Sequence, residues 1–475
     1  MANRPAGAPP REGDELDGFR LGPRIHLGGM AAIHRLVGPK GPLPLVIKIP
    51  RLGIGEPASN VISFEVERMV LGVLSGRQVP RLICTGDVET RPYLVMEHVE
   101  GPPLEDWVVR APLPPHEVAR LGAAVASSLY ELHKQDVVHL DVKPANVLMR
   151  PDGTAVLIDF GLAHHSRFPD LLAEEFRMPV GNWPYMAPEQ ILGVRCDPRS
   201  DVYALGVILY ELTTGRLPFG MPTSMRRLRQ RLSRDPVPPR ALVPDTPEWL
   251  QEVTLRCLEV QAANRYASAA QIAFDLSHHD QVVISERGRR LRGAGWAVRL
   301  RRWLWAAGYE PGPCPPASVQ VNVAPIVLVA IATTHTDEAV FEALREATRR
   351  LIAAENQCRI ACVTVTPPEP ALGAERIEDA ATSVHIRHLV QLRHWAKPLQ
   401  LPEERLTFHV IESSAPAAAL IEYAKANQVD QILIGAPPPR GLTPWRGSVA
   451  SQVMAEASCS VTVVRPRAGT ESPVE

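Results

Sequence analysis

The sequence predicts two folded domains in one chain. The first is an α+β domain in which a small, sheet-rich lobe is joined to a larger helical lobe, and the second is an α/β domain with a doubly wound parallel sheet. Three observations predict this arrangement. The chain has 475 residues, more than one hydrophobic core usually organises. Residues 18–280 place short apolar runs before helix-like stretches, whereas residues 323–466 alternate strand and helix signals.

The composition is that of an ordinary globular protein and excludes several classes. Hydrophobic residues make up 45% and charged residues 22% of the chain, so extensive disorder is not expected. The formal net charge of -1 argues against a general nucleic-acid binder, and we expect no nucleic-acid partner. No apolar run is long enough to cross a bilayer, and the N-terminus lacks the apolar region of a secretory signal. We therefore expect a soluble, cytoplasmic protein.

The cysteine pattern agrees with that location. Seven cysteines are scattered along the chain without a Cys-x-x-Cys pair, and an odd number argues against a disulfide framework. We interpret them as free thiols in a reducing cytosol.

Strand-like and helix-like patterns follow one another through the first domain. The segments PLVIKIP and RPYLVMEHV are short apolar runs typical of strands, and from VARLGAAVASSLYELHKQ onward the apolar residues recur with a period near 3.6. The predicted boundaries are a flexible segment over residues 1–17, the first domain over 18–280, a basic and Pro-rich linker over 281–322, the second domain over 323–466, and a tail over 467–475.

Four polar residues stand in otherwise apolar segments in the middle of the first domain. HLDVKPANVL contains Asp141, Lys143 and Asn146, and IDFG contains Asp159. Magnesium ions that bridge ATP phosphates need oxygen ligands, which Asn146 and Asp159 can supply. A carboxylate such as Asp141 can accept the proton of an attacking hydroxyl, and Lys143 can neutralise charge on the moving phosphoryl group. The pattern therefore predicts phosphoryl transfer.

An earlier pair of charged residues fits the same chemistry. Lys48 ends the strand-like segment VIK, and Glu67 lies on the helix-like stretch FEVERMVLGVL. The Lys48 ammonium can hold the α- and β-phosphates of ATP only if it is oriented, and a helix carboxylate such as Glu67 orients it.

In these residues the chain resembles the eukaryotic-like Ser/Thr protein kinases, many of them bacterial, over residues 18–277. The resemblance implies the bilobal protein kinase fold, ATP with Mg²⁺ (Mn²⁺ as an alternative), and protein substrates that include the chain itself. It also implies that Met96 is the gatekeeper and that Glu97 and Val99 offer hinge backbone to adenine. The remaining implied positions are an apolar spine of Leu71, His139 and Phe160, an anchor of the catalytic loop at Asp201, and a buried ion pair between Glu189 and Arg265.

The Gly-rich loop departs from the family pattern. His26 and Ala31 occupy the first and third glycine positions of GPRIHLGGMAAIH, whereas Gly28 and Gly29 remain at the tip. Glycines let backbone amides approach phosphate closely. Losing one preorganised donor costs on the order of a hundredfold in rate at worst. We therefore predict a slower kinase, and the alternative is a pseudokinase scaffold that binds nucleotide without transfer.

Both halves of the usual activation-loop phosphorylation switch are missing. Leu140 precedes Asp141 where many regulated kinases have an Arg that pairs with a phosphorylated residue. Residues 159–189 contain no Thr, and their side-chain hydroxyls belong to Ser166 and Tyr185. We predict activity that does not depend on phosphorylation of this loop.

The second domain resembles the universal stress protein family over residues 323–466. The resemblance implies a flavodoxin-like doubly wound sheet, which often dimerises through its last strand, so a homodimer is one expectation. Pro438 replaces a glycine of the family's phosphate-binding loop, and Ala332 stands where an Asp is expected, which argues against ATP binding. We favour a stress-sensing or dimerisation module, and the alternative is a stress-signalling adaptor. The loop positions that the chain keeps are Gly435, Gly447 and Ser448.

Two stretches are rich in arginine. Over residues 287–305, arginines interleave with Trp296, Trp303 and Trp305. We interpret this stretch as a helix that docks its tryptophans on one of the domains, with a membrane surface or a partner protein as alternatives. The segment 226–234 is interpreted as a solvated helix face, with docking of acidic substrates as the alternative.

Overall fold

A computed structural model describes most of the chain, whose internal contacts divide it into two units. The first unit comprises residues 1–279 and 284–320, and the second comprises residues 280–283 and 321–475. Each unit is described by itself below. The described residues are 11–38, 43–51, 59–86, 92–175, 181–293, 295–307, 315–322, 325–333, 338–355, 357–368, 387–402, 405–436 and 448–466.

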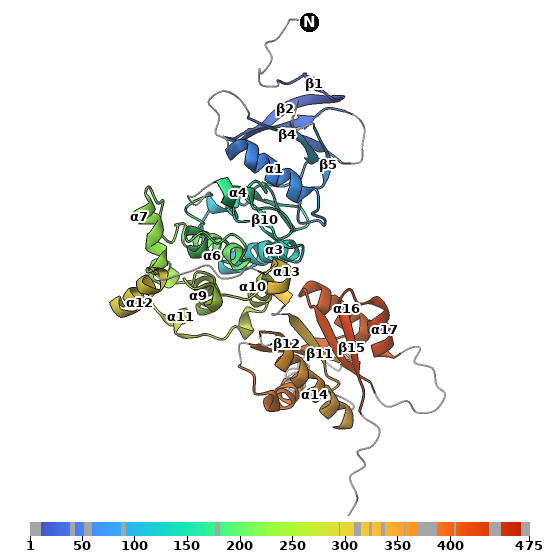
Figure 1. Ribbon diagram of the computed structural model, residues 1–475. Coiled ribbons are helices and arrows are strands. Elements are labelled where there is room, and N and C mark those ends of the chain that lie inside the picture. Colours follow the sequence, from blue (N-terminus) through green and yellow to red (C-terminus); the bar gives the residue numbers. More distant parts are fainter. Residues whose placement is uncertain are drawn as a thin grey trace, which may run out of the picture. The chain divides into compact units, whose positions relative to one another are not determined.

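The first unit begins with an antiparallel sheet in the order β1-β2-β3-β4-β6-β5, beside which helix α1 lies (Figure 1). Leu21, Ile47 and Val95 form its apolar core and are at most 1% exposed. Strand β4 pairs with β3 on one side and β6 on the other, so the backbone of Lys48 is held by two ladders. The elements are β1 Glu15–Leu16, β2 Phe19–Leu27, β3 Ala31–Leu36, β4 Leu45–Pro50, α1 Ser59–Leu71, β5 Leu82–Thr85 and β6 Leu94–Glu97.

The larger lobe is built around helix α6, Arg199–Thr214, whose residues are nearly all buried. Helices α3 (Pro115–His133) and α9 (Glu248–Cys257) contact α6, and α10 (Ala269–Ser277) packs along α3. A Cβ at Gly206 would lie 2.6 Å from the Cβ of Cys257, so glycine at this position allows α6 and α9 to approach closely. This packing gives the rigid base from which the loops of the site project.

Short elements complete the larger lobe. Strand β7 pairs with β10, and β8 pairs with β9, both antiparallel. The predicted order, with strands first and helices afterwards, is confirmed. The remaining elements are α2 Glu105–Val108, β7 Val137–Val138, η1 Pro144–Asn146, β8 Val147–Met149, β9 Ala155–Leu157, β10 His164–His165, α4 Leu171–Glu175, α5 Pro188–Ile191, α7 Met225–Leu228, η2 Arg229–Leu232, α8 Pro239–Leu242, η3 Ala262–Asn264, η4 His279–Gln281, α11 Glu286–Arg289, α12 Trp296–Ala307 and α13 Ala317–Asn322.

Helix α12 is held by Arg302, whereas two of its tryptophans are exposed. Arg302 donates to Asp235 and lies 3.4 Å from the Oε2 atom of Glu259. Trp296 is 77% exposed and Trp303 is 58% exposed. The prediction that this stretch docks its tryptophans is therefore wrong for these two residues.

The second unit is a parallel sheet in the order β13-β12-β11-β14-β15. The chain moves from β11 outward to β13 and then returns to the other side for β14 and β15, so the sheet is doubly wound, as predicted. Helix α14 and the helical residues 387–396 cover one face, and α16 and α17 lie on the other (Figure 1). The elements are β11 Ile326–Ala330, α14 Glu338–Ala354, β12 Arg359–Thr366, η5 Lys397–Leu399, β13 Leu406–Glu412, α16 Pro416–Ala426, β14 Gln431–Gly435, α17 Val449–Glu456 and β15 Ser460–Val464.

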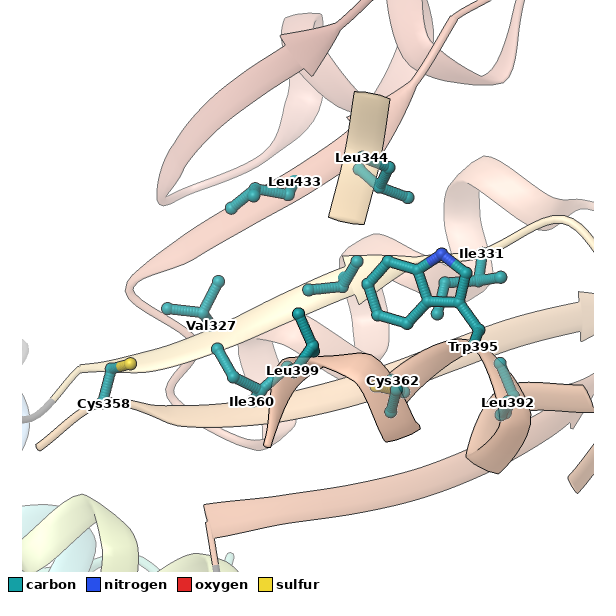
Figure 2. Packing of buried hydrophobic residues seen from close by; sticks show 12 residues of the cluster. Val327, Ile331, Leu344, Cys358, Ile360, Cys362, Leu392, Trp395, Leu399 and Leu433 are labelled. Atoms are coloured by element: carbon teal, nitrogen blue, oxygen red, sulfur yellow. The ribbon is translucent and has the colours of Figure 1, made fainter. Parts of the chain in front are cut away.

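Alternate residues of the parallel strands build the core on the α14 face. Figure 2 shows Val327 and Ile360 from the strands facing Leu344 from α14 and the indole of Trp395. Trp395 is 2% exposed, and its Nε1 donates to the carbonyl of Phe341 at 3.3 Å, so its one polar atom is satisfied. Burial of both faces explains the near-continuous apolar runs of these strands.

A short piece of chain at the start of the linker, residues 280–283, belongs to this second unit. The side-chain amide of Gln281 donates to the carbonyl of Phe408 at 3.1 Å and accepts from its backbone N at 2.9 Å. Phe408 lies on β13, the strand at one end of the sheet, so Gln281 satisfies backbone groups at that edge.

The cysteines are mostly, but not all, free. Five described cysteines are free thiols: Cys84, Cys257, Cys358, Cys362 and Cys459. Cys196 is disulfide-bonded, so the interpretation of the cysteines as free thiols is wrong at this position. Cys314 lies outside the described residues.

Candidate active site

Three segments that are far apart in the sequence meet at Lys48. Its Nζ lies 2.6 Å from the Oε2 atom of Glu67 on α1 and 2.9 Å from the Oδ1 atom of Asp159. Lys48 comes from β4, where its neighbours in the ladder are Ile33 and Leu94. The predicted pairing of Lys48 with Glu67 is thus present in the structure, together with a second contact to Asp159.

Electrostatics keep Lys48 and Asp159 charged. The positive charge of Lys48 lowers the pKa of Asp159 to about 2, against the opposing effect of burial. Burial alone would lower the pKa of Lys48, but the carboxylates of Asp159 and Glu67 outweigh it, and the pKa is raised. Burial raises the pKa of Glu67, which is 2% exposed, and the Lys48 charge opposes that rise. Asp159 is therefore an anion throughout the neutral range, as a metal ligand must be.

The Asp141 carboxylate accepts hydrogen bonds from three donors. Lys143 Nζ lies 2.6 Å from Oδ2, Asn146 Nδ2 donates to the same oxygen at 2.9 Å, and the backbone N of Asn182 donates to Oδ1 at 3.2 Å. The short helix η1 turns the chain so that Asn146 also reaches the Asp141 carbonyl at 2.9 Å. The three predicted residues of this loop are therefore brought together, with Asp141 held in one orientation.

The loop that carries Asp141 is anchored by Asp201 on helix α6. Asp201, 1% exposed on α6, accepts from the backbone N of His139 at 2.8 Å and from that of Leu140 at 2.9 Å. His133 Nε2 lies 2.9 Å from the same carboxylate. This confirms the anchoring role that the resemblance implied for Asp201.

The apolar residues implied to form a spine lie in the core. Phe160 is fully buried, and its ring centroid lies 5.0 Å from that of His139. His139 Nε2 lies 3.1 Å from the carbonyl of Ile158, and Leu71 at the end of α1 is 3% exposed. Phe160 and His139 therefore link the segments that carry Asp159 and Asp141.

The implied buried ion pair is also present. Arg265 lies with Nη1 2.6 Å from Oε1 of Glu189 and Nη2 2.7 Å from Oε2 of Glu189. Ser200 Oγ donates to the same Glu189 oxygen, Oε1, at 2.7 Å. This bidentate pair fixes the end of the activation segment, residues 159–189, to the large lobe.

The Gly-rich turn is held by side chains of Arg51 and Asn60, which the sequence did not predict. The backbone N of Gly28 donates to the Ala31 carbonyl at 3.0 Å, and Arg51 Nη1 donates to the Gly28 carbonyl at 3.3 Å. Asn60 Nδ2, from α1, lies 3.5 Å from the Gly29 carbonyl. A Cβ at Gly29 would meet nothing within 4 Å, so glycine there is not required by packing and leaves room for a ligand.

The predicted adenine region lies at the end of β6. Met96 is 8% exposed and Val99 6% exposed. The backbone N of Glu97 donates to the Arg81 carbonyl at 2.9 Å, and its carboxylate lies 2.7 Å from Arg150 Nη2. The Glu97 side chain thus joins the two lobes of this unit.

In the segment 226–234, which was predicted to be a solvated helix face, one arginine, Arg231, is buried. Arg231 is 1% exposed and donates from Nη1 to the carbonyls of Met186 at 2.6 Å and Pro184 at 3.2 Å. Burial lowers the pKa of this guanidinium. Its neighbours Arg227 and Arg229 are exposed, as the solvated face requires. Hydrogen bonds to backbone carbonyls leave no mark in the sequence, which is why Arg231 was missed.

In the activation segment, the hydroxyl of Ser166 is buried and that of Tyr185 is hydrogen-bonded. The Ser166 Oγ atom is buried without a hydrogen-bond partner, and Tyr185 OH donates to Glu211 at 2.6 Å. Burial, with the hydrogen bond to Glu211, raises the pKa of Tyr185. Residues 176–180 lie outside the described part of the chain.

Replacing Ser166 by Ala is expected to leave phosphate transfer within about twofold of the parent, because the hydroxyl is buried and makes no hydrogen bond. Initial rates of the variant and the parent at saturating ATP measure this. A loss of tenfold or more would show that the Ser166 hydroxyl takes part in activation.

The nucleotide positions of the second unit are only partly described. Ser448 caps α17 by accepting from the backbone N of Ser451, and Gly435 ends β14. Ala332, exposed just after β11, brings no carboxylate to this end of the sheet. Pro438, which replaces a glycine of the family loop, lies outside the described residues, and so does Gly447, which the chain keeps.

The fold and the site together define the first unit as a protein kinase domain. Comparison with protein families agrees: the protein kinase domain family matches residues 54–279, and the universal stress protein family matches residues 325–465. The chain therefore contains a protein kinase domain followed by a universal stress protein domain. Both resemblances drawn from the sequence are confirmed.

Individual relatives are bacterial kinases. The chain is 31% identical over 265 residues to the serine/threonine-protein kinase PknB of Mycolicibacterium smegmatis, a match covering 55% of this chain and 42% of that protein. It is 33% identical over 304 residues to the serine/threonine-protein kinase Pkn1 of Myxococcus xanthus, covering 62% of this chain and 42% of that one. A solved kinase domain of Mycobacterium tuberculosis PknI is 23% identical with a TM-score of 0.44, covering 57% of this chain and 100% of that one. The chain thus spans about two fifths of the length of these two curated relatives.

Proposed function

We propose that this chain is a Ser/Thr protein kinase that transfers the γ-phosphate of ATP to hydroxyl groups of proteins, including its own. The observation that carries the proposal is the convergence of two charged groups. In the first group, Lys48 contacts both Glu67 and Asp159. In the second group, Lys143 and Asn146 both contact Asp141.

The donor set fits a divalent cation. Asp159 stays anionic because its pKa is about 2, and its side chain is 41% exposed. Asn146 uses its amide nitrogen on Asp141, and its amide oxygen suits a hard cation. We assign Asp159 and Asn146 as ligands of Mg²⁺, with Mn²⁺ as the alternative. When bound, the metal would neutralise charge on the phosphates.

The chain's own residues would position the reactants. Lys48 would hold the α- and β-phosphates of ATP, and the backbone amides of Gly28 and Gly29 would approach the same phosphates. Asp141 would accept the proton of the attacking hydroxyl, while Lys143 would offset the charge that develops on the transferred group. We assign the adenine contacts to Met96, Glu97 and Val99.

We propose that the universal stress protein domain is a stress-sensing or dimerisation module. Strand β15 stands at one end of the sheet order, and an edge strand carries backbone groups that can pair with a second copy. A homodimer through this edge would favour autophosphorylation between protomers. Sedimentation velocity on the full chain decides this, since a monomer at all concentrations would contradict it.

We further propose a cytoplasmic location, where ATP and protein substrates are supplied. No helix among the described residues is long and apolar enough to cross a membrane. The exposed Trp296 and Trp303 leave contact of residues 287–305 with a membrane surface as a prediction, and nucleic acid is not among the proposed partners.

The experiment that tests the function is transfer of labelled phosphate from ATP with Mg²⁺ to the chain itself and to a basic protein. The parent chain is compared with Asp159→Ala, which removes the anionic ligand. Incorporation by the parent alone supports the proposal. ATP binding without incorporation by either would instead favour the pseudokinase scaffold or the stress-signalling adaptor, for which the altered glycine positions at His26 and Ala31 are the supporting observation.

A further inference from the structure

The segment that leads into the second unit packs on the first unit. Residues 315–320 carry the start of α13, and their contacts assign them to the kinase unit. They lie beyond the family match, which ends at residue 279, and shortly before β11 begins at Ile326. The segment 315–320 is therefore an addition of this chain to its kinase domain.

Ser318 binds the residue that leads into the catalytic loop. Its backbone N, at 3.2 Å, and its Oγ both donate to Oδ1 of Asp136. Asp136 is 7% exposed and has a φ of 63°, a left-handed conformation that residues other than glycine seldom adopt. Its carbonyl accepts from the backbone N of Ser166 at 3.1 Å, and its other carboxylate oxygen lies 3.2 Å from Arg167. Asp136 thus connects segment 315–320 to the start of the activation segment.

Ala317 packs on the catalytic loop itself. It is 2% exposed and forms an apolar cluster with Val138 and Leu140. Leu140 directly precedes Asp141, and its carbonyl accepts from Gln190 Nε2 at 3.0 Å. An apolar side chain at this position cannot bind a phosphate group, so the contact with Ala317 is the restraint that the structure offers there instead.

Gln320 reaches the loop that follows the activation segment. Its Nε2 donates to the carbonyl of Cys196 at 3.0 Å. The adjacent Arg195 lies 2.8 Å from Oδ2 of Asp170 and donates to the carbonyl of Leu162 at 3.0 Å, and both belong to the activation segment. Segment 315–320 therefore bridges the catalytic loop and the loop that follows the activation segment.

We propose that residues 315–320 are a positioning segment that holds the catalytic loop and the activation segment in working geometry, through Asp136, Leu140 and Cys196, without phosphorylation of the activation segment. The proposal rests on the proposed function, since the geometry in question is that of phosphate transfer. Because the segment continues into the universal stress protein domain, displacement of its C-terminal end would act first on these three contacts.

The first test replaces Ser318 by Ala in the full-length chain. We expect kcat for phosphate transfer to fall about tenfold, because a hydrogen bond to a buried carboxylate is lost. The KM for ATP should stay unchanged, since Ser318 contacts none of the residues assigned to ATP. Ser318→Thr keeps the hydroxyl and should restore kcat. Hydrogen–deuterium exchange over residues 136–142 should become faster in Ser318→Ala.

A matched control lies in the same linker. Ser285 also donates from both its backbone N and its Oγ to a buried carboxylate, that of Glu252, away from the catalytic loop. Ser285→Ala loses the same kind of hydrogen bond, and its kcat should equal that of the parent. An equal loss in both variants would overturn the proposal, because it would show a general effect of loosening the linker.

A second variant, Ala317→Arg, forces the segment off its site, because the side chain at this position is 2% exposed. We expect a larger loss of kcat and faster exchange over residues 136–142. All assays contain a reductant, because Cys196 is disulfide-bonded. A gain in transfer would make the segment an inhibitor and overturn the proposal. If the parent transfers no phosphate, the proposed function fails, and unchanged exchange in both variants would then overturn the positioning segment independently.

Discussion

Replacing Asp141 by Asn is expected to lower kcat for phosphate transfer by about 10²–10⁴-fold, the usual contribution of a general base. The amide has the same shape, and its oxygen can still accept from Lys143 or Asn146, which now surround the carboxylate at 2.6 and 2.9 Å. The loop should therefore keep its position while losing the group that accepts the proton. The ATP dissociation constant should change little, because Asp141 is not among the residues assigned to ATP.

The control for this variant is Asp235→Asn. The side chains of Asp141 and Asp235 are both 6% exposed, and Asp235 lies 3.1 Å from Arg290 in an ion pair away from the catalytic loop. Initial-rate measurements should show unchanged kcat for Asp235→Asn, even if its melting temperature falls. A loss below tenfold in Asp141→Asn would mean that another group accepts the proton.

Residues with a fixed chemical task could be predicted from the sequence. Phosphate transfer restricts Lys48, Asp141, Asn146 and Asp159 to one or two residue types, so their order along the chain is informative before any geometry is known. The structure brings Lys48 within 2.6 Å of Glu67, as the sequence predicted, and adds a contact of 2.9 Å to Asp159. The doubly wound sheet was predictable for a similar reason, because strands buried on both faces must be continuously apolar.

Contacts made by common residue types could not be predicted. Ala317 and Ser318 occur on any surface, and they matter here only because of the backbone and the carboxylate that they meet. Arg231 lies in a stretch whose other arginines are exposed, yet it is buried and donates to the carbonyls of Pro184 and Met186. A carbonyl acceptor exists at every residue, so such a partner leaves no trace in the sequence.

The largest loss of stability is expected when Arg265 is replaced by Met. Glu189, 4% exposed, would be left in the protein interior without the two hydrogen bonds of 2.6 and 2.7 Å. Removing one partner of a buried ion pair costs about 3–5 kcal/mol. Arg265 also donates to the carbonyls of Arg199 at 2.7 Å and Glu259 at 2.8 Å, which would lose their donor. The free energy of unfolding of the kinase unit in the full chain measures the loss.

Two comparisons separate the buried charge from the lost side chain. The double variant Arg265→Met with Glu189→Gln removes the isolated charge, so it should be more stable than Arg265→Met alone. Arg289→Met removes a 67% exposed arginine that lies 3.6 Å from Glu248, and it should cost at most about 1 kcal/mol. In denaturant unfolding, the transition of the kinase unit is the one that added Mg²⁺ and ATP shift. If the double variant were no more stable than Arg265→Met, the loss would come from the carbonyls and the packing around Arg265, and the ion pair itself would contribute little.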